Sequence, residues 1–522
     1  MDQTYSSVEW SRLVRTERGI EWLVDGKPFI AYSGEAHNSS GSSTEHMRKH
    51  VWPAAKALHC NAVIVPVYWE LCEPEEGIFD FALVDDLLAD AREAGQRLIL
   101  LWFGTLKNAV STYAPGWVKR DRKRFPRARR KDGNACGHTC LTVCSEAVAE
   151  ADGRAFAALM KHLREADSDR HTVVMIQVEN ETGILGTPRD FSPEAEAVFA
   201  GPVPQALLDG LAAKGGAVRP ELNGWKRGTT WTECFGPLAD EVFSAWCFAS
   251  FLQKVTAAGR REYPLPCYVN AWLVYPGQKA GDYPSGGPVT RMKDIWQIAA
   301  PDVAFLAPDI YQPCFREICN DYAARDNPLF IPEAHRNATA VPHLLYAVGQ
   351  CGALCFSPFG FEDMLTNAVQ AIVGNEIFDD GTDRGNHDSG VTLAAAYAMM
   401  RNMEPALMDA RRSGGIGGFL QTADAESDTV TVDGIAFHAE YRAPAGGKPE
   451  GAGIVFRSGD YFYVAGIECS VYPDGDGVEV ESIDEGRFVQ GEWVRGRRLN
   501  GDEFGCWFGG LPNVLRLKLI RK

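Results

Sequence analysis

The sequence predicts an α/β protein: a (β/α)8 TIM barrel over residues 1–410, followed by a smaller, sandwich-like all-β domain over residues 419–522. Three observations predict this fold. Short apolar runs alternate with helix-like stretches through the first part. Each apolar run ends in polar, aromatic or glycine-rich sequence, as expected at the carboxyl ends of barrel strands. The remaining chain changes to closely spaced β-rich runs. A doubly wound open sheet is the main alternative for the first part.

Bulk composition fits this size and restricts the partners. A chain of 522 residues that is 45% hydrophobic can bury a large core and form more than one domain. A net charge of −17 argues against a nucleic acid or a membrane surface as partner. The N-terminus lacks the basic and apolar regions of a signal peptide, so we expect a cytoplasmic protein, or a periplasmic one if a leader was trimmed. The sequence leaves open whether it forms a homo-oligomer.

The 14 cysteines are scattered through the apparent strands and helices, which favours reduced core residues over a disulfide scaffold. Cys136, Cys140 and Cys144, with His138 between them, bring ligand-type side chains into one short span. Their spacing matches no common zinc signature, so a loop is favoured and a metal site is left open. Because no phosphate-binding glycine motif follows a strand, we expect no cofactor.

The barrel begins after a β-hairpin. Residues 19–31 contain two apolar runs divided by Asp25-Gly26, a strong two-residue turn signal. The first barrel strand is predicted at 29–33, and Glu35 follows it.

Strand and helix signals then alternate. The second strand is predicted at 61–68, where Tyr68 and Glu70 mark its end, and residues 81–91 carry apolar side chains at helical spacing. The third strand is predicted at 97–103, followed by a helix around 155–163.

The fourth strand, within 172–178, runs directly into Glu179, Asn180 and Glu181. An apolar run of this kind is typical of a strand buried on both faces. A long insertion at about 184–240 is expected to form walls of the site, and an outer helix follows at 239–258. The last four strands are predicted at 267–272, 303–310, 329–332 and 353–357.

A helix at 391–410 is predicted to close the barrel, and the glycine-rich segment 411–418 to form a flexible linker. Short β-rich runs then indicate a sandwich or barrel; they lie at 429–432, 435–441, 453–457, 461–467, 478–483 and 514–520. A structural role for this domain is favoured over an independent carbohydrate-binding module.

Two strand ends carry the chemistry. Glu181 follows the fourth strand and Glu333 ends the seventh. In a closed barrel both ends project into the same mouth, so the two carboxyl groups can flank one bond, as glycoside cleavage requires. Strand alternation places Glu179 on the same face as Glu181, so spacing alone cannot choose between them, although Glu181 lies nearer the strand end.

Three stretches in order resemble family 35 β-galactosidases, retaining glycosidases of clan A: VDGKPFIAYSGEAHNS, NAVIVPVYWELCEPEEGIFDF and IQVENETG. The resemblance implies that Glu181 is the acid/base, Glu333 the nucleophile, and Asn180 a hydrogen-bond partner near the sugar 2-hydroxyl. It also implies an accessory β-domain. Thr182 departs from the family's Asn-Glu-Tyr-Gly pattern, so packing beside Glu181 must differ.

Further residues at strand ends are candidates for sugar binding. Tyr311 is expected to hydrogen-bond the nucleophile, Glu35 a 4- or 6-hydroxyl, and Trp272 to stack on a sugar face. The full predicted binding set is Asn180, Glu35, Tyr68, Glu70, Asn270, Trp272 and Tyr311.

The function predicted on these grounds is a retaining exo-β-galactosidase acting on a carbohydrate substrate. Three alternatives stay open: a related β-glycosidase of another sugar specificity, a non-catalytic sugar-binding barrel, and a metal-dependent sugar isomerase. No metal is assigned to the site, because the histidines show no paired ligand spacing.

Overall fold

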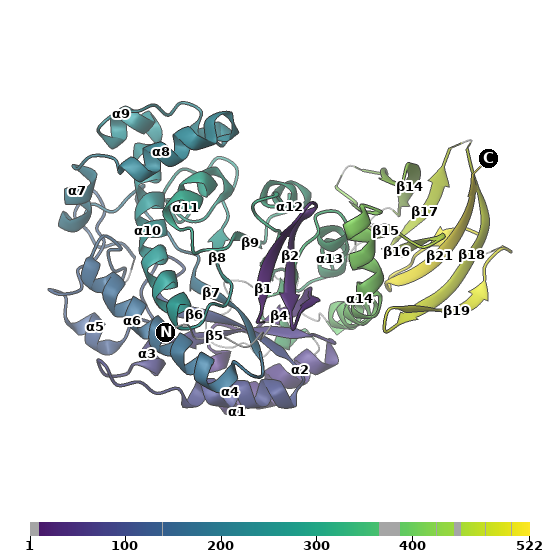
Figure 1. Ribbon diagram of the computed structural model, residues 1–522, viewed down its shortest axis with the longest axis horizontal. Coiled ribbons are helices and arrows are strands. Elements are labelled where there is room, and N and C mark those ends of the chain that lie inside the picture. The colour runs from purple at the N-terminus through teal and green to yellow at the C-terminus, as the bar shows by residue number, and fades with distance from the viewer. Residues whose placement is uncertain are drawn as a thin grey trace, which may run out of the picture.

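A computed structural model describes residues 10–137, 139–364, 387–423, 425–442, 450–475, 477–502 and 504–521 (Figure 1). Its centre is a closed barrel of eight parallel strands in the order β10-β11-β4-β5-β6-β7-β8-β9. The strands are β4 (Ala31–Glu35), β5 (Ala62–Tyr68), β6 (Arg97–Lys107), β7 (Val173–Asn180), β8 (Cys267–Trp272), β9 (Leu306–Ile310), β10 (Ile331–Ala334) and β11 (Cys355–Pro358). The predicted barrel is confirmed, and the open-sheet alternative is excluded because β11 pairs with β4.

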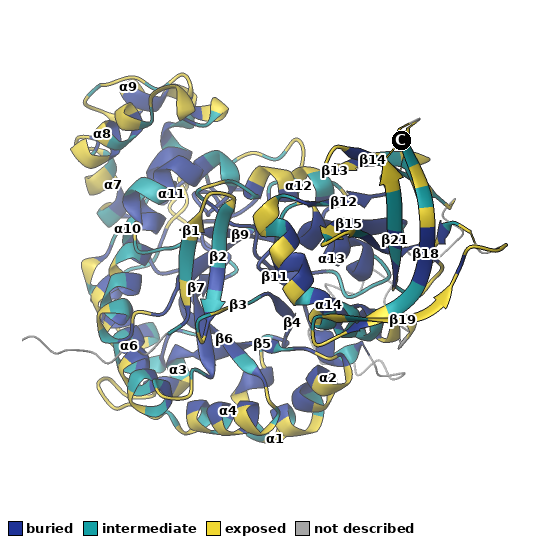
Figure 2. Cartoon of the chain, turned by 45° about the vertical axis from the view of Figure 1, so that its right-hand side comes forward, coloured by how far each residue is buried: buried dark blue, intermediate teal, exposed yellow. Residues whose placement is uncertain are grey.

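The strands are buried on both faces because their side chains alternate between two cores. In β5, Ile64 faces the barrel interior, while Val63 and Val65 face the surrounding helices. Figure 2 shows these strands in dark blue beneath partly exposed helices. The helices are α1 (Thr44–His46), α2 (Trp52–Ala57), α3 (Trp69–Cys72), α4 (Ala82–Glu93), α5 (Gly116–Arg120), α6 (Glu146–Asp167), α10 (Ala239–Glu262), α11 (Lys293–Ala299), α12 (Phe315–Tyr322), α13 (Ala340–Gly349) and α14 (His387–Ser413).

The predicted hairpin lies at the amino end of the barrel. It consists of β2 (Gly19–Val24) and β3 (Lys27–Pro28), with β1 (Arg12–Thr16) pairing on its other side. Asp25 and Gly26 both have positive φ, as the predicted two-residue turn requires. Trp22 packs against Phe29 and Phe330, which precede β4 and β10. The hairpin therefore closes the end of the barrel opposite the carboxyl ends of its strands.

The C-terminal domain is a pair of antiparallel sheets, with strand orders β12-β15-β16-β21-β18-β19 and β13-β14-β17-β20. Alternate residues of β15 (Ala452–Ser458) serve two interfaces: Val455 faces the other sheet, and Ile454 packs against Gly349 of α13. The other strands are β12 (Ile416–Leu420), β13 (Ser427–Val432), β14 (Ile435–Tyr441), β16 (Tyr461–Ile467), β17 (Cys469–Asp474), β18 (Val478–Val489), β19 (Glu492–Arg498), β20 (Cys506–Trp507) and β21 (Asn513–Arg521).

The prediction of a flexible linker at 411–418 is wrong. Helix α14 continues to Ser413, and β12 begins at Ile416, directly after a turn in which Gly414 has φ +79°. The next glycines are needed for close packing. A Cβ on Gly417 would lie 2.3 Å from Val430 Cγ2, and one on Gly418 would lie 2.7 Å from the Gln350 nitrogen. Glycine here therefore reflects close packing, of Gly417 against β13 within the C-terminal domain and of Gly418 against the barrel domain.

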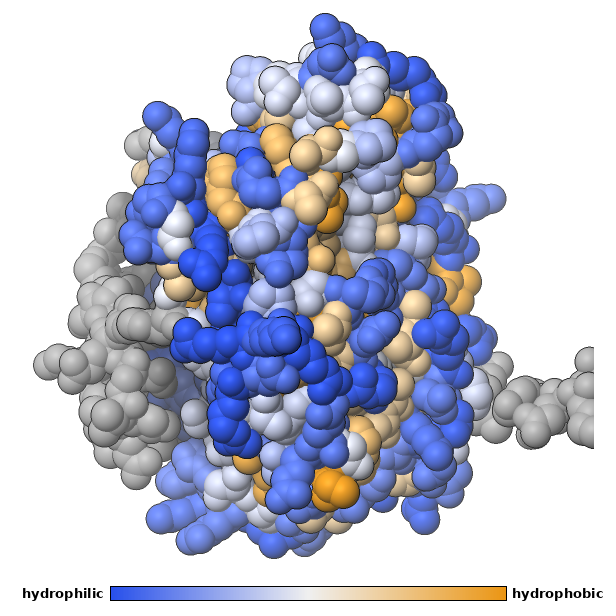
Figure 3. All heavy atoms as spheres, turned by 90° about the vertical axis from the view of Figure 1, so that its left-hand side faces the viewer, coloured by the Kyte–Doolittle hydropathy of each residue, from blue (hydrophilic) through white to orange (hydrophobic). Residues whose placement is uncertain are grey.

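The insertion at 184–240 forms a helical layer beside α10 and α11 that contains α7 (Pro193–Phe199), α8 (Gln205–Lys214) and α9 (Trp231–Phe235) (Figure 1). The side of the molecule that carries this layer is mostly hydrophilic, with scattered apolar spots (Figure 3). Within the described ranges, no helix is long and apolar enough to span a bilayer.

Candidate active site

A cavity of about 300 Å³ opens at the carboxyl ends of the barrel strands. The residues that line it follow several different strands, as expected for a site in this fold. They are Asn38, Lys107, Asn108, Glu181, Trp272, Leu273, Tyr275, Asp309, Tyr311, Gln312, Glu333, Ala334, His335, Arg336 and Phe359. None of these residues belongs to the 184–240 insertion, so the prediction that the insertion forms a wall of the site is wrong.

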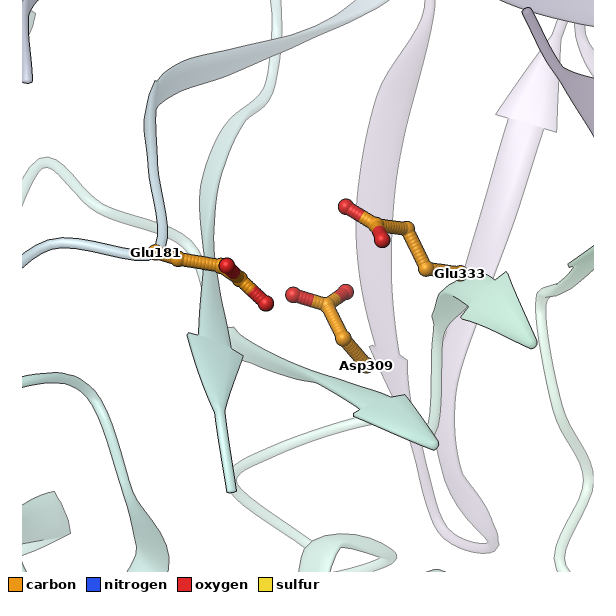
Figure 4. A group of neighbouring side chains, drawn as sticks. All are labelled: Glu181, Asp309 and Glu333. Atoms are coloured by element: carbon orange, nitrogen blue, oxygen red, sulfur yellow. The ribbon is translucent and has the colours of Figure 1, made fainter. Parts of the chain in front are cut away.

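Three carboxyl groups converge on this cavity from different strands (Figure 4). Glu181 follows β7, Asp309 belongs to β9 and Glu333 to β10. One oxygen from each lies within 4.8 Å of the others. All three are buried, so their charges are poorly screened and at least one proton or cation is required to offset them.

Glu333 is held by donors on both carboxylate oxygens. The Tyr311 hydroxyl donates to Oε2 at 2.8 Å, and Asn180 Nδ2 donates to Oε1 at 3.3 Å. Asn270 Nδ2 makes a longer contact of 3.5 Å with Oε1. Such donors fix the orientation of the carboxylate.

Lys107 determines how Asn180 is oriented. Its ammonium group donates to Asn180 Oδ1 at 2.9 Å and also contacts the Asn108 amide oxygen. Because the ammonium group can only donate, the Asn180 oxygen must face it, and the Asn180 NH2 group is turned toward Glu333. Burial and the charge of Glu333 raise the pKa of Glu35 and Glu181, and the positive charge of Lys107 offsets part of that rise.

Glu181 is a carboxyl group in a weakly solvated position. Burial, followed by the charge of Glu333, raises its pKa to about 7. Its backbone N–H donates to Asn270 Oδ1 at 2.9 Å, and its φ is +46°. A non-glycine residue in this left-handed region is strained by on the order of 1 kcal/mol, which the Asn270 contact helps to offset.

Glu179, the competing acid in the sequence, lies outside the cavity. Its carboxyl group accepts hydrogen bonds from the backbone N–H groups of Thr105 at 2.9 Å and Leu106 at 2.5 Å. It faces Asp152 of α6, and burial together with that carboxylate raises its pKa. The prediction that Glu179 and Glu181 share a face is wrong, because Glu179 has φ +62° and strand alternation ends there.

Thr182 and Gly183 are covered by the loop after β8. A Cβ on Gly183 would lie 2.5 Å from Pro284 Cβ, and one on Gly287 would lie 2.5 Å from the Thr182 carbonyl oxygen. Ile184 forms a bridge with Ser285. This loop therefore packs against the backbone of Thr182 and Gly183 beside Glu181.

The predicted binding residues divide into three groups. Trp272 and Tyr311 line the cavity. Asn180, Asn270 and Glu35 are buried outside the lining set, where Asn180 and Asn270 contact Glu333. Burial and the charge of Glu333 raise the pKa of Glu35.

Tyr68 and Glu70 are the third group, and the structure does not bring them to the cavity. Tyr68 is 3% exposed and donates a hydrogen bond to the Asn38 carbonyl. Glu70 lies in α3 and forms an ion pair of 3.0 Å with Lys119. Neither residue is among those that line this cavity, and substrate binding by Tyr68 and Glu70 stays a prediction.

The sequence reasoning missed several lining residues. Asp309 ends an apolar run two residues before Tyr311, so the strand-end signal that identified Glu333 could also have identified it. Lys107 was missed because β6 extends beyond the predicted strand end at residue 103. Asn38, Gln312 and Arg336 lie in loops, where no periodic pattern marks them.

The cysteine cluster does not form a ligand set among the residues with described positions. Cys136 and Cys140 are buried, whereas Cys144 interacts with Cys247 on α10. His138 lies outside the described residues. In the described part of the chain, one group of acidic, histidine or cysteine side chains is close enough to share an ion, and it is Glu181, Asp309 and Glu333.

Two family models match separate parts of the chain. Residues 43–208 match glycoside hydrolase family 42, described as beta-galactosidase. Residues 393–508 match a domain of unknown function. The first match covers β5 to β7 and includes Glu181, whereas the predicted membership of family 35 is not confirmed.

Individual proteins are similar to parts of this chain at low sequence identity. A beta-galactosidase of Xanthomonas manihotis is 24% identical over 190 residues, which cover 35% of this chain and 28% of that protein. Among solved structures, a beta-galactosidase from the psychrophilic Marinomonas ef1 has a TM-score of 0.47 and 12% identity, covering 73% of this chain and 61% of its own. The catalytic domain of a beta-amylase from Paenibacillus polymyxa has a TM-score of 0.46 and 11% identity, covering 64% and 93%.

Proposed function

We propose that this protein is a retaining exo-β-galactosidase that removes terminal β-linked galactose from oligosaccharides or other glycosides. The observation that carries the proposal is the pair of carboxyl groups, Glu181 and Glu333, which line one cavity and of which one oxygen each lies within 4.8 Å of the other. Retaining glycosidases keep their two carboxyl groups about 5–5.5 Å apart, whereas inverting enzymes need about 6.5–9.5 Å to admit a water molecule. The match of residues 43–208 to a beta-galactosidase family supports the sugar class.

In the first step, Glu333 attacks the anomeric carbon and the glycosidic bond to the leaving oxygen breaks. Glu181 transfers its proton to that oxygen, so the aglycone leaves as a neutral alcohol. The ionised nucleophile is oriented by Tyr311 and Asn180. A galactosyl ester of Glu333 is the product.

In the second step, a water molecule enters where the aglycone left. The Glu181 carboxylate takes a proton from it, the water oxygen attacks the anomeric carbon, and the bond to Glu333 breaks. Two displacements at one carbon restore the β configuration. Glu181 regains its proton and Glu333 its charge, so the site returns to its starting state.

The size of the cavity supports removal of a single terminal sugar. About 300 Å³ is at the lower end of the range for small-molecule sites, and Trp272 and Tyr275 supply aromatic surface at its wall. Galactose differs from glucose at one hydroxyl. Arabinose- and fucose-type glycosides are further competing substrates.

A panel of aryl glycosides with anomer-resolved product detection tests the proposal. Hydrolysis of aryl β-galactosides with β-galactose released first is expected, and binding without turnover of the panel would instead indicate a sugar-binding barrel.

The acid/base role of Glu181 predicts a specific pH dependence. Its carboxyl group must be protonated in the first step, and its pKa is raised to about 7 by burial and by Glu333. For alkyl β-galactosides, kcat/KM should therefore be level just below pH 7 and fall about tenfold per unit well above it. A dinitrophenyl β-galactoside, whose leaving group needs no proton, serves as the control and should show a much weaker alkaline decline. An alkaline limb near pH 5 with the alkyl substrate would contradict the role.

The proposed reaction uses no metal, which distinguishes it from sugar isomerisation. Extended incubation with EDTA, followed by removal of the chelator, should leave hydrolysis of aryl β-galactosides unchanged. Loss of activity that returns with one added divalent cation would contradict the proposal. It would indicate that the three clustered carboxylates hold a cation that hydrolysis needs, whereas an isomerase would instead show cation-dependent interconversion of free sugars without hydrolysis of the glycosides.

A further inference from the structure

Asp309 forms a carboxyl–carboxyl contact with Glu181 that the reaction steps above do not use. Its side chain is in the cavity floor and is 3% exposed. One of its oxygens points toward the Glu181 carboxyl group and lies within hydrogen-bonding reach of it (Figure 4). Two ionised carboxylates have only acceptor atoms, so a hydrogen bond between the two groups requires a proton on one of them.

The other contacts of Asp309 indicate which group holds the proton. Asn270 Nδ2 donates to Asp309 Oδ2 at 2.7 Å, as expected for a carbonyl oxygen. Oδ1 receives no hydrogen bond from an N–H or O–H group of the described residues, as expected for the hydroxyl oxygen of a carboxylic acid. Asp309 is also less exposed than Glu181, at 3% against 8%. Burial and the neighbouring carboxylates raise its pKa well above the usual range.

We propose that Asp309 remains a neutral carboxylic acid throughout turnover and donates a hydrogen bond to Glu181, acting as a positioning residue for the acid/base. This rests on the proposed glycosidase function. When Glu181 has given its proton to the leaving oxygen, it becomes a carboxylate in a site with little water. The Asp309 hydroxyl then stabilises that carboxylate, as the Tyr311 hydroxyl stabilises Glu333. No proton leaves Asp309 in either step.

The charges around Asp309 favour its neutral form. An ionised Asp309 would add a negative charge to a group that already contains an ionised nucleophile, with one ammonium group nearby. The titratable groups that face Asp309 or its Glu181 partner are Glu35, Lys107, Tyr268, Tyr311, Tyr322 and Glu333. These groups are unchanged in an Asp309 variant, so its pH profile must be compared with the wild-type profile.

Two substitutions separate a neutral donor from a charged neighbour. Asp309→Asn keeps a donor toward Glu181 and an acceptor for Asn270, so kcat should stay within about fivefold and the alkaline limb should not move. Asp309→Leu has a similar volume but no donor. It should lower kcat by about 10- to 100-fold and shift the alkaline limb upward, because the Glu181 carboxylate loses its hydrogen bond.

The opposite sign would overturn the proposal. If Asp309 were ionised, Asp309→Asn would remove a negative charge beside Glu181 and would shift the alkaline limb downward by about one unit or more. Thermal unfolding of both variants should be cooperative, which shows that the kinetic changes occur in folded enzyme. A downward shift of the alkaline limb in folded Asp309→Asn would refute the neutral form of Asp309.

Infrared difference spectroscopy tests the proton without relying on turnover. At pH 6, the wild-type minus Asp309→Asn spectrum should contain the C=O stretch of a carboxylic acid. The matched control is Asp321→Asn, which removes a partly exposed carboxylate paired with Arg219 and should give only carboxylate bands. Carboxylate bands alone in the Asp309 difference would overturn the inference. An inactive wild-type protein would instead refute the proposed function, so the two failures are distinguishable.

Discussion

Glu333→Gln is expected to lower kcat on aryl β-galactosides by on the order of 10⁴- to 10⁶-fold, the range seen when a covalent nucleophile is removed. The amide has nearly the same shape as the carboxylate but cannot attack the anomeric carbon. KM should change little, because the cavity wall around residue 333 is retained. The measurement is steady-state hydrolysis of a nitrophenyl β-galactoside by enzyme free of wild-type contamination.

The Glu333→Gln variant should keep its fold. In the proposed resting state Glu333 carries the negative charge of the buried carboxyl cluster, so replacing it with a neutral amide removes a desolvation cost and the melting temperature should stay the same or rise. The matched control is Glu317→Gln, an exposed position on α12 outside the cavity, which should retain full activity. Full activity in folded Glu333→Gln would refute the assignment of the nucleophile.

Glu181→Ala is expected to lower kcat on alkyl β-galactosides by about 10²- to 10⁴-fold, the usual contribution of a general acid/base. With a dinitrophenyl leaving group the first step needs no proton, so a galactosyl-enzyme should accumulate. Azide fits the space left by the side chain and needs no base, so it should restore turnover and give β-galactosyl azide. Stopped-flow release of dinitrophenol and product analysis measure both effects.

Glu179→Ala is the matched control for the acid/base. It removes a carboxyl group of the same chain segment that lies against Asp152, outside the cavity. It should lower the melting temperature, because the backbone N–H groups of Thr105 and Leu106 lose their acceptor. It should not create azide-dependent turnover. Azide rescue of Glu179→Ala but not of Glu181→Ala would reverse the assignment.

Local patterns in the sequence were sufficient for the barrel. Apolar runs of strand length, separated by helical periodicity, gave all eight barrel strands to within a few residues, and the Asp25-Gly26 turn gave the hairpin. These features depend on hydrophobic burial and turn chemistry, which act over short distances along the chain. The linker prediction failed because glycine has two uses. At Gly417 and Gly418 it allows close contact with residues remote in sequence.

The site could be predicted only in part. The end of each strand was a reliable guide to Glu181, Glu333 and Tyr311, which all line the cavity. The same rule gave Glu70, whose side chain is turned toward Lys119 by the short helix α3 and lies outside the lining set. It failed to separate Glu179 from Glu181, because the positive φ angles that turn one outward and the other inward have no sequence signature.

The sequence by itself determined the barrel, the second β-rich domain and the two strand-end carboxyl groups assigned to the chemistry. The tertiary structure decided that these groups lie within 4.8 Å of each other, that Asp309 is the third member, and that Glu179 faces α6. The physical reason is that periodicity reports which face of an element is buried. The distance between carboxyl groups about 150 residues apart depends on barrel closure, and their protonation depends on burial and on charges contributed by β4, β6, β9 and β10.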